Sequence, residues 1–388
     1  MKKALNGLMA VCVIAALLCA AVIAVVKPET VNYYENRPAE SFPAFSASDA
    51  LSGEYQDALE SALHDQIPTA QLLEEQYQNG MNALILKALF AQSEARPDAY
   101  YQFNNLMLFH GDIVYAPVDP AEKMGELSAK AKNLNLIFAE HPELSFYVFY
   151  IEKDTDMDFE TNTPTGFGQT ALSMLWLPDD HKAVHEVKSF EDFRENFFRT
   201  DHHWNRFGSY AGYLHLMKLL GKTDPITPRG TRRLTDDFCG AKAITSGAAA
   251  YFSEPFDVYV FDFPPMDITV NGFGPADYGR QSIEWDEEEF GPPAYGAYYG
   301  FDEGEVAFHT HNIGAGNLLV IGESFDNAIL KLLASHFENL YSVDLRAYEE
   351  DMHTPFRFSE YVEAHDIDSV LFIGNIDFFQ MDAFDVEG

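Results

Sequence analysis

Short apolar runs alternate with segments of helical spacing along the last quarter of the chain. The apolar runs are short enough to be buried strands, and they cover residues 317–325, 340–346 and 369–375. Between them, residues 326–340 and 358–366 carry apolar positions at helical spacing. Because strands separated by helices usually pair in one direction, this order predicts a mostly parallel sheet with helices on its faces.

Similar patterns extend this α/β domain toward the N-terminus. A hairpin is expected at residues 107–117, a helix at 121–141, a strand at 144–152 and an amphipathic helix at 204–221. A stretch near residues 222–316 is rich in Gly, Pro and aromatic residues, which indicates a loop- and β-rich insertion. We therefore place the main domain at residues 100–388.

The first 99 residues follow a different pattern. Lys2 and Lys3 precede an uncharged run at residues 8–26, which is long enough to cross a bilayer as a helix of about 20 residues. The lysines place the N-terminus in the cytoplasm and the rest of the chain outside. A cleaved secretory signal is the alternative reading of residues 1–27, and it would give a secreted protein. Residues 28–99 are expected to form an extended stalk and a helix pair that is broken at Pro68.

Composition and charge narrow the classes of partner. The chain carries 25 Lys and Arg against 61 Asp and Glu, a net charge of −36. Such a surface repels phosphates, so a nucleic acid partner is not expected. Cys239 is the only cysteine after the first apolar run, which excludes an intrachain disulfide and a cysteine-based zinc site there.

A candidate catalytic residue lies at the end of the apolar run at residues 317–325. Ser324 would stand at the carboxyl end of a parallel strand, where ligands bind, with Gly322 permitting a sharp turn into the next helix. The N-terminus of that helix would stabilise an oxyanion. A serine needs a base and an orienting acid, and "DHHW" at residues 201–204 offers Asp201 and a histidine. Spacing alone does not decide between the two histidines.

Four motifs together resemble one known family. They are "ENR" at residues 35–37, "TDHHW" at 200–204, "IGESFDN" at 321–327 and "VDLR" at 343–346. Their order and spacing resemble the DHHW family of exported bacterial proteins, which is related to the alginate O-acetylation proteins and to SGNH hydrolases. The resemblance implies an SGNH-like three-layer α/β/α fold and a location at the bacterial cell membrane, or outside the cell if the leader is cleaved.

The same resemblance implies a mechanism and partners. Ser324 would be the nucleophile, His203 the base and Asp201 the orienting acid of an O-acetyltransferase or acetylesterase that acts on an envelope or exported polysaccharide through an acyl-enzyme. Glu323 departs from the family pattern, which has Asp there. A membrane-bound O-acyltransferase is the implied acetyl supplier, and neither a cofactor nor a metal is expected. Residues with a candidate oxyanion or substrate-binding role are Asn375, Arg346, Asn327, Gly322 and Trp204.

Other readings remain open. His202 and His203 with His309 and His311 would form a metal site if they converged. A non-catalytic carbohydrate-binding or scaffold protein would keep the fold but hold Ser324 out of reach of His203. Trp204 is expected to anchor the turn by packing. The aromatic run at residues 295–301 suits either sugar stacking or core packing, and Arg346 suits either substrate binding or a salt bridge.

Overall fold

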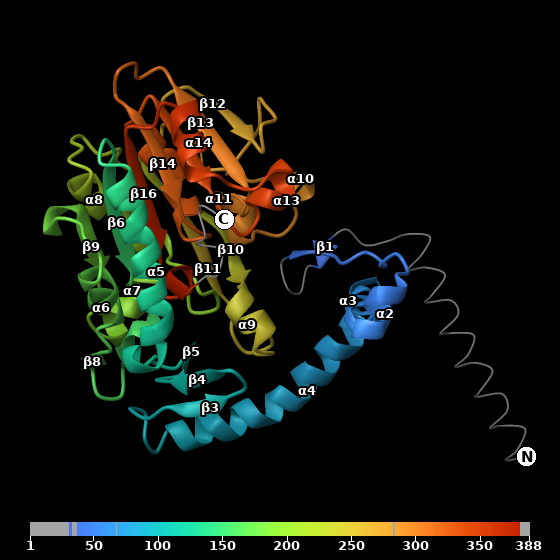
Figure 1. Cartoon of the computed structure of the whole chain (residues 1–388). Helices are drawn as coiled ribbons and strands as arrows, with labels where there is room; N and C mark the ends of the chain where they lie inside the picture. The colour runs from blue at the N-terminus through green and yellow to red at the C-terminus, as the bar shows by residue number, and fades with distance from the viewer. Residues whose placement is uncertain (1–30, 33–36, 67, 282–283, 381–388) are drawn as a thin grey trace, which may run out of the picture. The chain divides into compact units, whose positions relative to one another are not determined.

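The structure is a computed structural model that describes residues 31–32, 37–66, 68–281 and 284–380 (Figure 1). Two compact units divide the chain, one formed by Met1–Ala95 with Ala241–Phe252 and the other by Arg96–Gly240 with Ser253–Gly388. The apolar run at residues 8–26, with the anchor or signal expected there, lies outside the described residues. Among the described helices, none has the length and apolarity needed to cross a membrane.

The first unit contains the expected helix pair. Helix α2 (Ala47–Ser52) is followed by α3 (Glu54–Gln66) and α4 (Pro68–Ser93), and the residue between α3 and α4 lies outside the described residues. Proline suits the first position of a helix because its missing N–H has no helical partner there. The segment with α9 (Ala241–Thr245) also belongs to this unit, since the amide of Asn82 on α4 donates to the Gly247 carbonyl at 3.0 Å. A two-stranded ladder, β1 (Val31–Asn32) with β2 (Arg37–Pro38), completes its described part.

A seven-stranded sheet forms the centre of the second unit. Its spatial order is β12 (Met266–Val270), β13 (Glu305–Thr310), β15 (Asn339–Val343), β14 (Asn317–Ile321), β16 (Ser369–Gly374), β6 (Ser145–Ile151) and β9 (Lys182–His185). The last five of these strands run parallel, whereas β13 is antiparallel to both neighbours. The α/β class is therefore confirmed, and the sheet is mixed.

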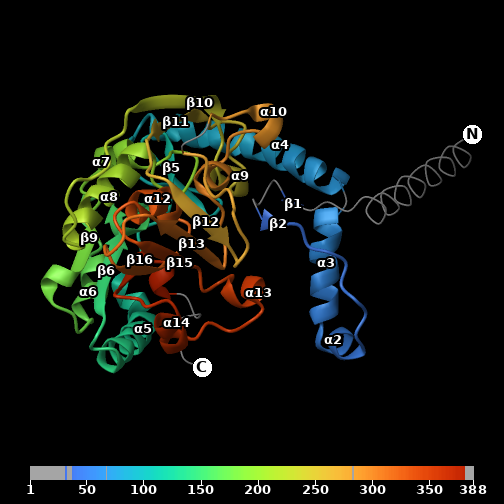
Figure 2. The same cartoon turned by 90° about the horizontal axis from the view of Figure 1, so that it is seen from above.

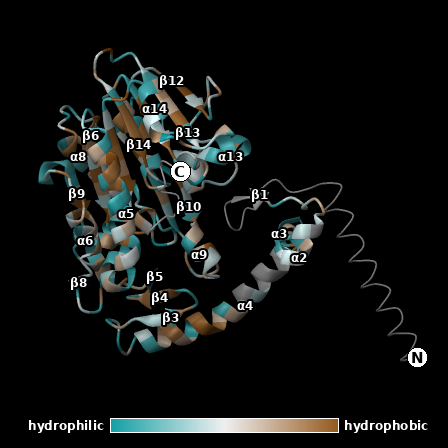
Figure 3. Ribbon diagram, viewed as in Figure 1, coloured by the Kyte–Doolittle hydropathy of each residue, from teal (hydrophilic) through white to brown (hydrophobic). Residues whose placement is uncertain are grey.

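Alternate residues of the central strands enter two separate cores. Phe149 on β6 and Val320 on β14 face one core, while Val148 and Leu319 face the other. The first core is covered by α8 (Arg206–Leu219) and α12 (Leu330–Ala334), the second by α5 (Pro120–Glu140), α6 (Phe167–Ser173) and α14 (Phe358–Ala364). Helices thus lie on both faces of the sheet (Figure 2), and the strands between them are apolar (Figure 3).

The helix expected at residues 326–340 is wrong in length. The chain forms a 3-10 turn at Asp326–Ala328 and then the five-residue α12, before β15 begins at Asn339. All five residues of α12 are buried, so its apolar positions do not mark one face of a surface helix.

The stretch expected to be an insertion contributes to the sheet. It supplies β12 and β13, together with a hairpin of β10 (Gly230–Phe238) and β11 (Glu254–Val260) and the short helices α10 (Glu287–Phe290) and α11 (Tyr295–Tyr299). The hairpin expected at residues 107–117 is present as β4 (Leu106–Phe109) and β5 (Asp112–Val114), with β3 (Tyr101–Phe103) beside β4. The remaining described elements of this unit are α7 (Phe190–Asn196), α13 (Tyr348–Met352), the two-residue strands β7 (Met157–Asp158) and β8 (Thr163–Pro164), and 3-10 turns at Asp154–Asp156, Asp179–His181 and Phe378–Gln380.

Candidate active site

Ser324 lies in the turn that follows β14, at the carboxyl edge of the sheet. The Asp326 N–H donates to the Glu323 carbonyl at 2.9 Å and closes this turn. Gly322 is required there by lack of room, since a Cβ atom would overlap the Asp326 carboxylate and come within 2.9 Å of Ile373. The expected help from a helix N-terminus is wrong, because a 3-10 turn and a five-residue helix follow the serine.

Asp201 and His203 lie in the loop between α7 and α8. The Phe198 N–H donates to the His203 carbonyl at 3.1 Å, and the Asn205 side chain caps α8 by accepting from the Phe207 N–H at 2.8 Å. Trp204 is fully buried, and Gly212 leaves room for its indole against α8. The prediction that Trp204 anchors the turn by packing is confirmed.

The structure brings Asp201, His203 and Ser324 into one hydrogen-bonded line. His203 Nδ1 lies 2.6 Å from Asp201 Oδ1, and His203 Nε2 lies 2.7 Å from Ser324 Oγ. A carboxylate can only accept, so Nδ1 carries the proton and Nε2 is left to accept from the Ser324 hydroxyl. Asp201 and His203 are buried, at 3% and 6% exposure, whereas Ser324 is partly exposed and can meet a substrate.

One face of the His203 ring and the back of Asp201 are held by packing. Tyr295 on α11 stacks on the His203 ring, with ring centroids 3.8 Å apart and an interplanar angle of 4°. Behind Asp201, a Cβ atom on Gly240 would come within 2.5 Å of its Oδ2 atom. Thr200 is fixed by Glu254, whose Oε1 accepts from the Thr200 N–H at 2.7 Å and from its hydroxyl at 2.8 Å. These contacts leave the carboxylate and the imidazole little freedom to turn.

Glu323 occupies a buried position beside the serine. Its Oε1 accepts from the Asn375 side-chain amide at 2.7 Å, and its Oε2 lies 3.5 Å from Ser324 Oγ. Burial raises the pKa of the Glu323 carboxyl to about 7, although the charges of Arg346 and Lys153 act to lower it. The backbone N–H of Asn375 also points to Glu323 Oε1, at 3.5 Å. An oxyanion role of Asn375 stays a prediction.

Arg346 and Asn327 belong to one polar network next to Glu323. Arg346 Nε donates to both oxygens of Asp344 at 2.9 and 3.0 Å, and its Nη2 donates to Asp302 at 2.7 Å. Asn327 donates to Asp302 at 2.9 Å and accepts from the Tyr278 hydroxyl at 2.8 Å. Arg346 is thus a salt-bridge partner, and a substrate-binding role of Arg346 or Asn327 stays a prediction.

A small cavity of about 10 Å³ lies beside Glu323, and five of its eleven lining residues are acidic. Among the described residues nothing donates to Asp326 Oδ2, which is buried at this cavity. Burial raises the pKa of Asp326 well above its usual value, and the charges of Asp344, Asp302 and Glu323 add to this effect. The cavity is just large enough for one water molecule.

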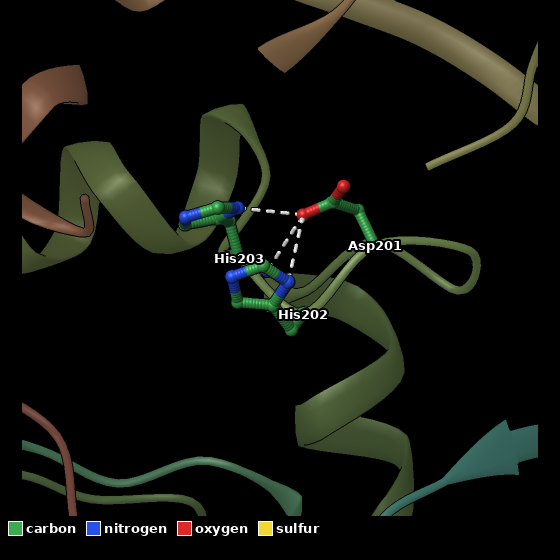
Figure 4. Close-up of side chains that lie close together, drawn as sticks. All are labelled: Asp201, His202 and His203. Atoms are coloured by element: carbon green, nitrogen blue, oxygen red, sulfur yellow. Dashed lines mark hydrogen bonds and ion pairs between the residues drawn. The ribbon is translucent and has the colours of Figure 1, made fainter. Parts of the chain in front are cut away.

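The four histidines of the metal alternative do not converge. His309 pairs across the sheet with Asn339, at the start of β15, whereas Ser324 follows the other end of the neighbouring β14. His202 Nδ1 lies 3.7 Å from Asp201 Oδ1, so Asp201, His202 and His203 form a tight group in the described part of the chain (Figure 4). Figure 4 shows one carboxylate oxygen facing both imidazole rings. The Nδ1 atom of His203 is already engaged by that oxygen.

Comparison with known proteins agrees with the motifs. Residues 183–343 match the model of the DHHW protein family. The match contains "TDHHW" and "IGESFDN", so the resemblance to this family is confirmed. No curated protein matches the sequence.

Solved structures share the fold. PatB1 from Bacillus cereus with a sulfonyl adduct superposes with a TM-score of 0.54 and 18% identity, covering 75% of this chain and 99% of that chain. A DHHW family protein from Eubacterium siraeum gives a TM-score of 0.52 and 15% identity, covering 74% and 96%. The O-acetyltransferase domain of Pseudomonas putida AlgJ gives 0.36 and 10%, covering 68% and 85%. The first two show a common fold with this chain.

The sequence analysis did not assign a role in the site to three residues, which are Tyr295, Gly240 and Lys153. Tyr295 was assigned to an aromatic run for which sugar stacking and core packing were both left open. Tyr295, Tyr298 and Tyr299 are all buried, which favours core packing for these tyrosines. Gly240 gives no sequence signal, because its importance comes from a neighbour 39 positions away. Lys153 follows β6 at the carboxyl edge, and the rule that sites form at this edge would have pointed to it.

Proposed function

We propose that this protein is a serine-dependent O-acyltransferase of SGNH-like architecture that acylates a carbohydrate through an acyl-enzyme. The observation that carries the proposal is the unbroken line from Asp201 through His203 to Ser324. Such a line activates a hydroxyl that is otherwise a weak nucleophile. The matched family and the shared fold with PatB1, whose structure carries a sulfonyl adduct, support it.

In this proposal each group of the hydrogen-bonded line has a role. Ser324 Oγ attacks the acyl carbonyl while its proton passes to His203 Nε2, and Asp201 stabilises the imidazolium through Nδ1–H. The imidazolium then gives its proton to the leaving group, and an ester bond to Ser324 remains. In the second half, a sugar hydroxyl gives its proton to His203 and takes the acyl group. The imidazolium returns this proton to Ser324 Oγ as the ester bond breaks, which frees Ser324. Water in place of the sugar would give an esterase.

A scaffold protein would hold its serine out of reach of the histidine. In this structure the separation of Ser324 Oγ and His203 Nε2 is 2.7 Å, so the geometry expected of a scaffold is not found. The acetyl group, the polysaccharide acceptor and a membrane-bound acetyl supplier remain proposals, as does a location at or outside the cell membrane.

The test uses the full-length protein, a chromogenic acetyl ester and a sulfonyl fluoride. We expect turnover, a covalent label found on Ser324 by mass spectrometry, and loss of both in Ser324→Ala. Ser335→Ala is the matched control, because Ser335 bonds to the Lys331 carbonyl on α12, and it should keep full turnover. A folded protein with no turnover and no label would overturn the proposal.

A further inference from the structure

Asp201, His202 and His203 place three metal-binding groups next to one another. One carboxylate oxygen and one ring nitrogen from each histidine all lie within 4.8 Å of one another (Figure 4). His202 Nδ1 is 3.7 Å from Asp201 Oδ1, and His203 Nδ1 is 2.6 Å from the same oxygen. Among the described residues, no other histidine, cysteine and carboxylate side chains are grouped this closely.

The spacing of these groups is close to that of a zinc site. A tetrahedral zinc ion with imidazole nitrogen and carboxylate oxygen ligands at about 2.0 Å holds the ligand atoms about 3.3 Å apart. The separations of 2.6 Å for His203 Nδ1 and 3.7 Å for His202 Nδ1 from Asp201 Oδ1 lie on either side of this value. Each pair would therefore shift by less than about 1 Å to take up an ion.

His202 connects this group with the solvent. Asp201 and His203 are buried, but the His202 side chain is 32% exposed. The His202 ring lies against the His203 ring, with centroids 3.9 Å apart and an interplanar angle of 36°. Because Tyr295 stacks in parallel on one face of the His203 ring, His202 covers the other face. A metal ion that reaches His202 from the solvent is thus already beside the two buried ligands.

We propose that Asp201, His202 and His203 bind one Zn²⁺ or Cu²⁺ ion, and that this ion inhibits the serine. Imidazole nitrogen is a preferred ligand of these ions, whereas Mg²⁺ prefers oxygen ligands and keeps several waters. The inhibition rests on the proposed function, because it requires that His203 acts as the base for Ser324. The binding itself does not depend on the reaction.

The ion inhibits because it changes which nitrogen of His203 carries the proton. Without metal, the proton is on Nδ1, and Nε2 accepts from the Ser324 hydroxyl. An ion bound to Nδ1 displaces this proton, and the neutral imidazole then carries its one proton on Nε2. In that form Nε2 donates to Ser324 Oγ and cannot take its proton. The Asp201 carboxylate binds the ion as well, so it no longer orients the ring through Nδ1–H.

The test follows turnover of a chromogenic acetyl ester by the full-length protein with added Zn²⁺, Cu²⁺ or Mg²⁺. We expect Zn²⁺ and Cu²⁺ to inhibit and a chelator to restore the rate, whereas Mg²⁺ at the same concentration has no effect. His202→Phe keeps a flat ring against His203 but offers no ligand atom. In this variant the Zn²⁺ concentration for half-inhibition should rise at least about tenfold, since losing a residue that merely orients a ligand already costs a metal site that much.

His311→Phe is the matched control for this substitution. His311 is exposed and follows β13 at the opposite edge of the sheet from Ser324, so this variant should respond to Zn²⁺ like the parent. Inhibition by Mg²⁺ as strong as that by Zn²⁺, or equal inhibition of the parent and His202→Phe, overturns the inference.

Isothermal titration calorimetry with Zn²⁺ on the same three proteins needs no turnover. The parent and His311→Phe should each bind one more equivalent of Zn²⁺ than His202→Phe, because binding to acidic groups elsewhere on the surface does not depend on His202. Equal binding by all three proteins overturns the inference, whether or not the ester is turned over. An inactive parent that still binds this equivalent overturns the proposed function and leaves the metal site standing.

Discussion

Replacing Glu323 by glutamine should make the protein more stable at high pH. The Glu323 carboxyl is 7% exposed, and its pKa lies at about 7 instead of the usual 4.5. A raised pKa means that the folded protein holds a proton that the unfolded chain has lost, so stability falls as the pH rises from 4.5 to 7. The full effect is about 3 kcal/mol, since a tenfold change in an acid constant is worth about 1.4 kcal/mol. Glutamine can still accept from Asn375 and never ionises.

The measurement is urea unfolding of the parent and Glu323→Gln between about pH 5.5 and 8, which avoids the sequence pI of about 4.5. Over this range the variant should gain about 2 kcal/mol relative to the parent. Other groups with raised pKa values, such as Glu152, are present in both proteins and cancel in the difference. Glu338→Gln is a matched control near the opposite end of the sheet and should show no such gain. Parallel pH dependences for parent and Glu323→Gln would refute the reasoning.

Two further predictions concern Asp201. Asp201→Asn should lower kcat for a chromogenic ester by about 10⁴-fold while the fold is kept. The reason is that an amide at this position can leave the His203 proton on the wrong ring nitrogen. A loss of kcat below about tenfold would contradict the role proposed for Asp201. Gly240→Ala should push Asp201 away from His203 and lower kcat/KM by about 100-fold, as measured beside the circular dichroism spectrum. Gly230→Ala, whose added Cβ atom meets nothing within 4 Å, is the matched control and should keep full activity.

The sequence predicted those parts of the fold that depend on local pattern. The strand at Asn317–Ile321 and the helix at Arg206–Leu219 follow from apolar runs and helical spacing, and the structure contains both. The helix predicted at residues 326–340 is too long, because a segment that is buried on all sides can show the same spacing of apolar residues as one face of a surface helix. Strands β12 and β13, which belong to the seven-stranded sheet, were read as part of an insertion, because long loops separate them from their partners in the sheet.

The reacting groups of the candidate site could be predicted from the sequence, but the residues that pack against them could not. Asp201, His203 and Ser324 are polar residues in recognisable motifs, so their types suggested their chemistry. Tyr295 and Gly240 act by shape alone, one as a flat face and the other as an empty volume. Shape depends on which segments meet in three dimensions, and one sequence does not contain that information.

The hydrogen-bonded line of Asp201, His203 and Ser324 depends on packing in the core as much as on its own hydrogen bonds. His203 is followed by Trp204 and Ser324 is followed by Phe325, and both aromatic side chains are fully buried. Their rings lie in contact, with centroids 5.8 Å apart, and Phe325 also packs against His203 at 5.0 Å. Because each polar residue is one position from its buried neighbour, packing of the two rings fixes the spacing of the two backbones. The 2.7 Å separation of His203 and Ser324, which lie 121 positions apart, is therefore set by close packing in the same core.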